Sequence, residues 1–120
     1  MTIEALSAVE LHIIRAMLVK QYGPASPFLN QLATARVDSR RVTRVGIFVN
    51  LLIAGNVAPV DQINTEISED YPTLLAPPCD LVGFTLFIRD GYLSFLEGYT
   101  FGDVGWPGDV LEKWLVLDTA

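Results

Sequence analysis

Two carboxylates that fall among apolar residues are the first candidates for chemistry in this chain. Glu10 projects into the apolar stripe of a predicted N-terminal helix, and Glu97 shares a face with the apolar residues of a predicted β-hairpin. Burial raises the pKa of a carboxyl group, so such a residue could serve as a general acid or base, or could anchor a cationic ligand. Three arginines lead into the neighbouring predicted strand and could pair with either carboxylate: Arg40, Arg41 and Arg44.

The alternative interpretation of both glutamates is structural. Paired buried charges are commoner than catalytic ones, and no second catalytic group lies near Glu97 in the sequence. We therefore assign no catalytic residue. A small-molecule-binding domain or enzyme that uses Glu97 paired with an arginine, with Arg44 as the candidate, stays open as a second hypothesis.

Other catalytic and metal-binding arrangements find little support. His12 is the only histidine, which excludes most metal centres and leaves one candidate base for a nucleophile. Cys79 precedes Asp80, a neighbourhood that would raise the pKa of the thiol. The glycines near the C-terminus match no phosphate-binding loop. We expect no metal site and no cofactor.

The acidic residues of the chain fit a solvated surface that keeps an apolar protein soluble. The alternative is a protein-binding face, which the distribution of charge and aromatic side chains supports. Residues 1–60 hold six basic and three acidic residues (+3), whereas residues 61–120 hold two basic and eleven acidic residues (−9). An acidic half of this kind repels nucleic acid and attracts a basic protein partner. Four aromatic residues could anchor such a partner within an acidic rim: Tyr71, Tyr99, Phe101 and Trp106.

Helices and strands must position these residues. Apolar residues at helical spacing predict a helix from Thr2, as its N-cap, to Tyr22, and Ser26 to Thr34 predicts a second helix. Alternating residues predict one long central strand over Arg40 to Ala54, and a helical turn is expected around Val60 to Glu69. The last segment, Asp109 to Leu117, fits a short helix, a strand, or one followed by the other.

The strongest local signal is a β-hairpin from Phe84 to Tyr99 that turns at Asp90-Gly91. Both turn residues tolerate the positive φ of a type I′ turn, and a two-residue loop fixes the register of the strands. In that register Glu97 faces Phe84 and shares the apolar side with Leu86. The hairpin therefore carries the residue whose placement most needs explaining.

The length of the chain predicts one domain spanning residues 1–120. The predicted elements make it an α+β domain, with an N-terminal helix packed on a small antiparallel sheet around the Asp-Gly hairpin. The longest apolar run, Val45 to Ala54, is interrupted by Asn50 and is much shorter than the roughly 20 residues of a membrane helix. The N-terminus does not resemble a secretory signal, and the lone Cys79 cannot form an internal disulfide. We expect a cytoplasmic protein with no membrane partner.

The region from about Arg40 to Pro107 carries an ordered set of motifs. RVGIFV at residues 44–49 is followed by GFTLFIRDGYLSFLEGYT at residues 83–100 and by Trp106-Pro107. This order resembles a family of short uncharacterised bacterial proteins with a GFF-like strand, a GFxLFxxDGxLxxLEGYT hairpin and a Trp-Pro. Somewhat similar hairpins occur in bacterial immunity proteins, which neutralise a toxin by binding it. The resemblance implies a binding role and no catalytic residue.

The leading hypothesis is therefore a non-enzymatic protein-binding module, including an immunity-type inhibitor of a basic partner. The high apolar content and the edges of a small sheet would also allow a homodimer.

Overall fold

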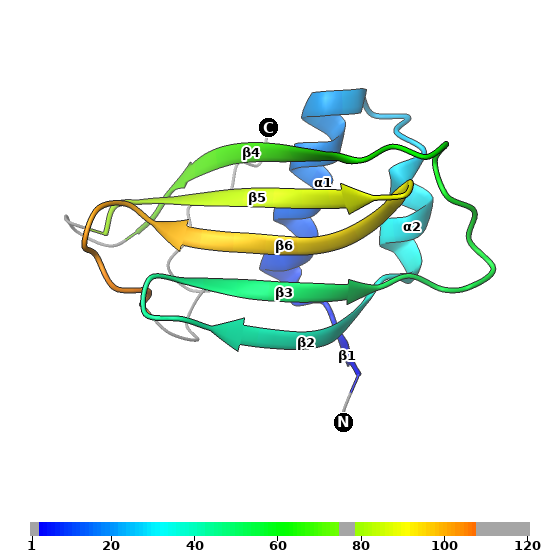
Figure 1. Cartoon of the computed structure of the whole chain (residues 1–120). Coiled ribbons are helices and arrows are strands. Elements are labelled where there is room, and N and C mark those ends of the chain that lie inside the picture. The colour runs from blue at the N-terminus through cyan, green and yellow to red at the C-terminus, as the bar shows by residue number, and fades with distance from the viewer. Residues whose placement is uncertain (1–2, 75–78, 108–120) are drawn as a thin grey trace.

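A six-stranded antiparallel sheet with two helices on one of its faces forms the part of the chain that the computed structural model describes, residues 3–74 and 79–107 (Figure 1). The α+β class is confirmed. The strands lie in the order β1-β2-β3-β6-β5-β4. In chain order the elements are β1 (Glu4–Ala5), α1 (Ala8–Tyr22), α2 (Phe28–Thr34), β2 (Arg36–Val42), β3 (Gly46–Leu52), β4 (Thr65–Pro72), β5 (Leu81–Arg89) and β6 (Tyr92–Thr100).

The first helix begins later than the sequence pattern predicts. It starts at Ala8, because Ser7 and Glu10 form a capping box: the Ser7 hydroxyl accepts the Glu10 N–H at 3.1 Å, and the Glu10 carboxylate accepts the Ser7 N–H at 2.9 Å. The predicted start at Thr2 is wrong, and β1 pairs with β2 where the helix was expected. α2 begins at Phe28, close to its expected start.

Two predicted elements between the helices and the hairpin are also wrong. The single strand expected over Arg40 to Ala54 is two strands, β2 and β3, joined by a turn in which the Thr43 N–H donates to the Gly46 carbonyl at 2.8 Å. No helical turn forms where one was expected around Val60 to Glu69: residues 60–64 lie in a loop, and β4, an edge strand that buries Ile67 and Tyr71, begins at Thr65. The segment Asp109 to Leu117 lies outside the described residues.

The apolar core lies between the helices and the sheet. Helix α1 buries one stripe of side chains, and strands β3, β5 and β6 bury every second residue against it. The fully or nearly buried members include Ile13, Ile14, Met17, Leu18, Phe28, Phe84, Leu86, Ile88, Leu93 and Leu96.

The turn between β5 and β6 is held by the loop that precedes β4. Asp90 and Gly91 both have positive φ, +53° and +79°. The Gly91 N–H donates to the Ile63 carbonyl, and the Gly91 carbonyl accepts the Val60 N–H, both at 2.8 Å. A Cβ on Gly91 would lie 2.5 Å from the Asp61 carbonyl oxygen. Glycine is required here by conformation and by space.

Helix α2 reaches the same turn through one buried amide. Gln31 is 0% exposed. Its Nε2 donates to the carbonyls of Gly91 at 2.8 Å and Ala58 at 3.3 Å, and its Oε1 accepts the Leu93 N–H at 2.9 Å. A buried amide left without these partners would cost about 1–3 kcal/mol, so the side chain fixes the position of the hairpin relative to α2.

Replacing Gly91 with alanine should destabilise the protein more than the same change at Gly102. Both glycines have positive φ, which costs an L-residue roughly 1–2 kcal/mol. A Cβ at Gly102 meets nothing within 4 Å, so Gly102→Ala isolates that conformational cost. Gly91→Ala adds a collision with the loop, which we expect to lower the free energy of unfolding by about 1–3 kcal/mol more. Urea denaturation of the two variants gives the difference, and equal losses would refute this account of the turn.

Candidate functional site: the open face of the sheet

A β-bulge in β6 reverses the face on which Glu97 lies. Next to the turn, Arg89 pairs with Tyr92 and Ile88 pairs with Leu93, but the following pair is Phe87 with Phe95. Ser94 is therefore an extra residue in β6, and beyond it every side chain lies on the opposite face from that of an unbroken ladder. The expected register is wrong from this point onward.

After the bulge Glu97 pairs with Thr85 and not with Phe84, so it does not share the apolar side with Leu86. It lies on the face that carries no helix among the described residues, which we call the open face (Figure 1). The expected buried carboxylate of the hairpin does not exist.

One row of open-face residues crosses five strands at the level of Glu97. Phe48 of β3 pairs with Glu97 on one side and with Arg41 of β2 on the other. On the far side of Glu97, Thr85 of β5 pairs in turn with Ser68 of β4, and the two hydroxyls are hydrogen-bonded at 2.9 Å. The row thus reads Arg41, Phe48, Glu97, Thr85, Ser68.

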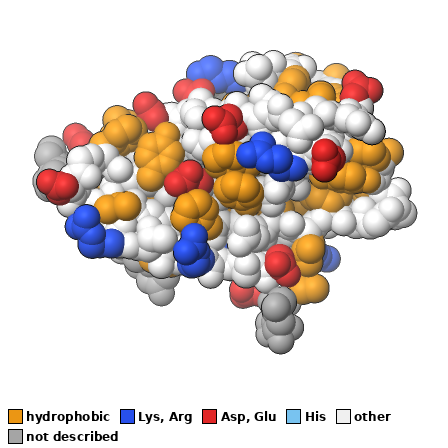
Figure 2. Space-filling view, in the orientation of Figure 1, with side chains coloured by type: hydrophobic (Ala, Val, Ile, Leu, Met, Phe, Trp, Pro, Cys, Tyr) orange, Lys and Arg blue, Asp and Glu red, His pale blue; other side chains and the backbone are white. Residues whose placement is uncertain are grey.

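Aromatic rings surround Glu97. Phe95 and Tyr99 lie two positions away on the same strand, and Phe48 lies beside it. The rings of Phe87 and Phe95 stack with centroids 4.2 Å apart and planes at 14°. Figure 2 shows hydrophobic side chains gathered over the middle of this face, with acidic and basic side chains among them. These rings are partly exposed.

Tyr99 is held flat against the sheet by a glycine. It pairs with Gly83, and a Cβ at Gly83 would lie 2.4 Å from the Tyr99 ring carbons Cε2 and Cζ. Phe101, which is 42% exposed, packs edge-to-face with the same ring, and the two ring centroids lie 5.7 Å apart. The missing side chain of Gly83 therefore gives the Tyr99 ring its place on the open face.

Glu97 has no ionic partner within residues 3–74 and 79–107. Its carboxylate forms no hydrogen bond or ion pair there. Arg41, on the other side of Phe48, stacks its guanidinium 4.8 Å from the centroid of that ring and also forms no ion pair in the described part of the chain. The arrangement combines an unpaired carboxylate with aromatic surface that can accept a cation.

The six expected binding residues do not all come together. Glu97, Tyr99 and Phe101 are neighbours on or beside the open face. Arg44 is exposed in the turn between β2 and β3, where its carbonyl accepts the Trp106 N–H. Tyr71 and Trp106 are buried on the helix side, where both rings pack edge-on against Phe84, so the expectation that they are exposed anchors is wrong.

Sequence reasoning missed Phe48, Phe87 and Phe95 as surface residues. Phe48 belongs to a segment that the sequence predicts to be covered on both faces, because apolar residues occupy both of its sides. The expected hairpin register puts Phe95 on the apolar side with Leu86 and Phe87 opposite Ser94, with no role assigned to it. The signal that could have found them is aromatic content: the open-face positions of β3, β5 and β6 carry phenylalanine where the helix-side positions carry mainly aliphatic residues.

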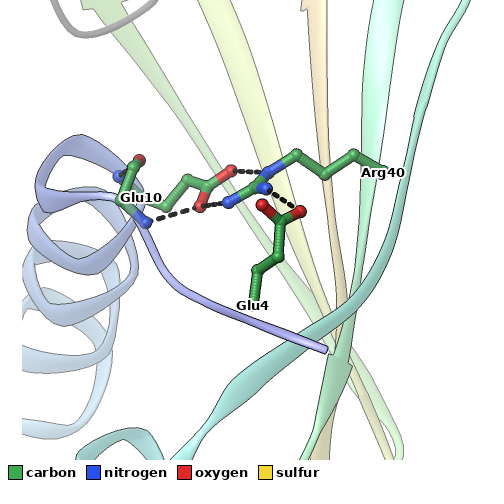
Figure 3. A network of polar contacts seen from close by, with 4 residues as sticks. Glu4, Glu10 and Arg40 are labelled. Carbon is green, nitrogen blue, oxygen red and sulfur yellow. Dashed lines mark hydrogen bonds and ion pairs between the residues drawn. The ribbon is translucent and has the colours of Figure 1, made fainter. Parts of the chain in front are cut away.

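Glu10 forms the carboxylate–guanidinium pair that Glu97 lacks (Figure 3). Arg40 points to the helix side of β2, and its Nε and Nη2 donate to the two Glu10 carboxylate oxygens at 2.8 and 2.7 Å. Its Nη1 donates to Glu4 at 3.1 Å. This bidentate contact joins the N-terminus of α1 to β2. Its role is structural.

The environment of Glu10 favours the ionised carboxylate. Burial alone raises its pKa, but hydrogen bonds from Arg40 and Ser7, together with the charge of Arg40, outweigh burial, so the pKa lies below the ordinary value of 4.5. A carboxyl group with a lowered pKa is a poor general acid at neutral pH. Catalysis by Glu10 is therefore disfavoured.

The remaining candidates for chemistry do not form a centre in the described ranges. Burial, and then the charge of Asp80, raise the pKa of the Cys79 thiol, which disfavours a nucleophilic thiolate. The Nε2 of His12 is buried without a hydrogen-bond partner. No group of three or more histidine, cysteine, aspartate or glutamate residues suited to a metal ion occurs among the described residues. None of the helices described is both long enough and apolar enough to cross a membrane.

No family model matches the chain, and neither a curated protein nor a solved structure matches it at a significant level. We therefore infer the function from the geometry and charges of the open face.

Replacing Glu10 with glutamine should remove part of the pH dependence of stability. Because the pKa of Glu10 in the folded state lies below 4.5, its charge stabilises the fold fully above that pH, and this contribution is lost as the pH falls through the folded-state value. We expect Glu10→Gln to lower the free energy of unfolding by about 1.5–3 kcal/mol at neutral pH. The difference from the unaltered protein should shrink below pH 4.5, as measured by urea denaturation across a pH series.

Glu4→Gln is the matched control, because Glu4 contacts the same guanidinium while its side chain is 60% exposed. An exposed pair contributes about 0–1 kcal/mol, so this variant should change little. A Glu10→Gln deficit that stays constant into acid would contradict the role given to Arg40.

Proposed function

We propose that this chain is a non-enzymatic protein-binding module that docks a basic protein partner on its open face. The observation that carries the proposal is the setting of Glu97. Within the described residues its carboxylate is unpaired, partly exposed aromatic rings surround it, and no helix covers its face. A lysine or arginine of a partner would find a charge to pair with and rings to pack against.

The aromatic surface supports tight contact at small conformational cost. Phenylalanine and tyrosine supply large contact areas with few rotatable bonds, and tyrosine is among the residues enriched at energetic centres of interfaces. Here the rings project from paired strands, and Phe87 and Phe95 already stack on each other. Since little must be ordered on binding, more of the contact energy remains as affinity.

The charge of the chain supports a basic partner. The net charge is −6 at pH 7, and the acidic excess lies in the half that contains β4, β5 and β6. On the open face Glu66 and Asp70 of β4 join Glu97. The negative electrostatic potential of these acidic residues speeds the approach of a positively charged protein. An ion pair with Glu97, shielded from water by the aromatic rings, then slows its release.

An inhibitor of the immunity type, acting on a toxin in the cytoplasm, is the form of this function that the hairpin resemblance favours. An enzyme that uses Glu97 with an arginine has less support, because the arginine of the same row, Arg41, lies across Phe48 and forms no ion pair in the described residues. Arg40 is already engaged by Glu10.

Reversing the charge of Glu97 should abolish partner binding without unfolding the protein. The immobilised chain is exposed to a lysate of the cells that produce it, at low and at moderate salt, and retained proteins are identified by mass spectrometry. We expect a basic protein to be retained by the unaltered chain and lost with Glu97→Lys, with weaker retention at higher salt.

Asp80→Lys is the control, because it makes the same charge change at an exposed residue that precedes β5. It should retain the same protein. The proposal fails if the unaltered chain retains nothing at either salt concentration, or if all three forms retain the same set.

A further inference from the structure

The open face carries its own candidate for the cation that Glu97 lacks. Arg41 and Glu97 lie in one row, one strand to either side of Phe48. Neighbouring strands are about 4.8 Å apart, so the backbone positions of Arg41 and Glu97 lie about equally far from that of Phe48. Neither forms an ion pair within the described residues. The first three residues of the row, Arg41, Phe48 and Glu97, therefore place opposite charges on the two sides of an apolar ring.

A row of this kind complements itself under one particular two-fold rotation. If the axis runs along β3 between two facing open faces, each Arg41 lies opposite the Glu97 of the other copy, and the two Phe48 rings meet at the axis. An axis across the strands would instead place Arg41 on Arg41, and an axis along β6 would superpose two Glu97 carboxylates. Like charges buried face to face cost several kcal/mol, so these arrangements are disfavoured.

We infer that a second copy of this chain docks on the open face, with reciprocal Arg41–Glu97 pairs about a two-fold axis along β3. Packed sheets lie about 10 Å apart, a gap that an arginine and a glutamate side chain bridge together. The incoming guanidinium would lie between Phe95 and Tyr99, which flank Glu97 on β6. The symmetry is isologous, as in most homodimers.

The overlap is small. Three strands of about seven residues, spaced as in any sheet, cover roughly 350 Å² on each copy. The total is below the roughly 1,200 Å² at which stable interfaces begin, so the dimer is weak and forms at high protein concentration. It would close the face that a basic partner needs, but it does not depend on such a partner.

Charge reversal at the two positions tests the inference. Self-association of the full chain is measured by sedimentation velocity from micromolar to near-millimolar concentration. The unaltered chain should form a reversible dimer. Arg41→Glu and Glu97→Arg should each weaken it at least tenfold, because each places like charges opposite one another twice, and the double variant should restore it. Arg15→Glu, an exposed change on α1, should leave it intact.

Thermal melts identify any variant that fails to fold, in which case Arg41→Gln and Glu97→Gln replace the reversals and should each weaken the dimer. A chain that is monomeric at the highest concentration overturns the inference, as do single variants that dimerise normally or a folded double variant that stays monomeric. The two proposals can fail separately. If the chain is monomeric but Glu97→Lys still abolishes retention of a basic protein, the dimer is refuted and the proposed function is supported.

Discussion

The buried amide of Gln31 is the contact on which the placement of the hairpin depends. It binds the carbonyl of Gly91 and the N–H of Leu93, and so holds the first residues of β6 against α2. Apolar packing alone would tolerate a small slide of the strand, whereas a buried amide does not tolerate the loss of its partners. With Leu93 fixed toward the core, the extra residue Ser94 turns the rest of β6 over. The exposure of Glu97 follows from that sequence of constraints.

Glu10 and Glu97 show how environment, and not residue type, decides what a carboxylate does. Glu10 is buried, yet its two oxygens are satisfied by Arg40 and by the Ser7 N–H, so its charge serves the fold. Glu97 is set among rings that exclude part of the water while offering no hydrogen bond among the described residues. A charge in that setting has most of its interaction energy still available to a partner.

The elements that the sequence predicts well are those with local chemical causes. The Asp90-Gly91 dipeptide specifies positive φ, and the apolar spacing of α1 marks its buried face as far as Leu18. The helix start was missed because the capping box at Ser7 competes with Thr2, and β4 was missed because its acidic residues suit either a helix or an exposed strand. The residue types of β6 do not indicate the bulge. Since all later positions depend on it, the sequence located Glu97, Tyr99 and Phe101 but placed Glu97 on the wrong face.

Because of Ser94, the residues exposed on the open face depend on whether the number of residues between the turn and Glu97 is odd or even. A strand has two sides, so adding or removing one residue between the turn and Glu97 exchanges the entire outer set, Phe95, Glu97 and Tyr99, with the inner one, while a change of two residues exchanges nothing. Among proteins with a similar hairpin, an odd difference in the length of this strand would mark a change of binding surface even where every motif residue is kept. The length of this strand, as well as the identity of its residues, therefore defines the site.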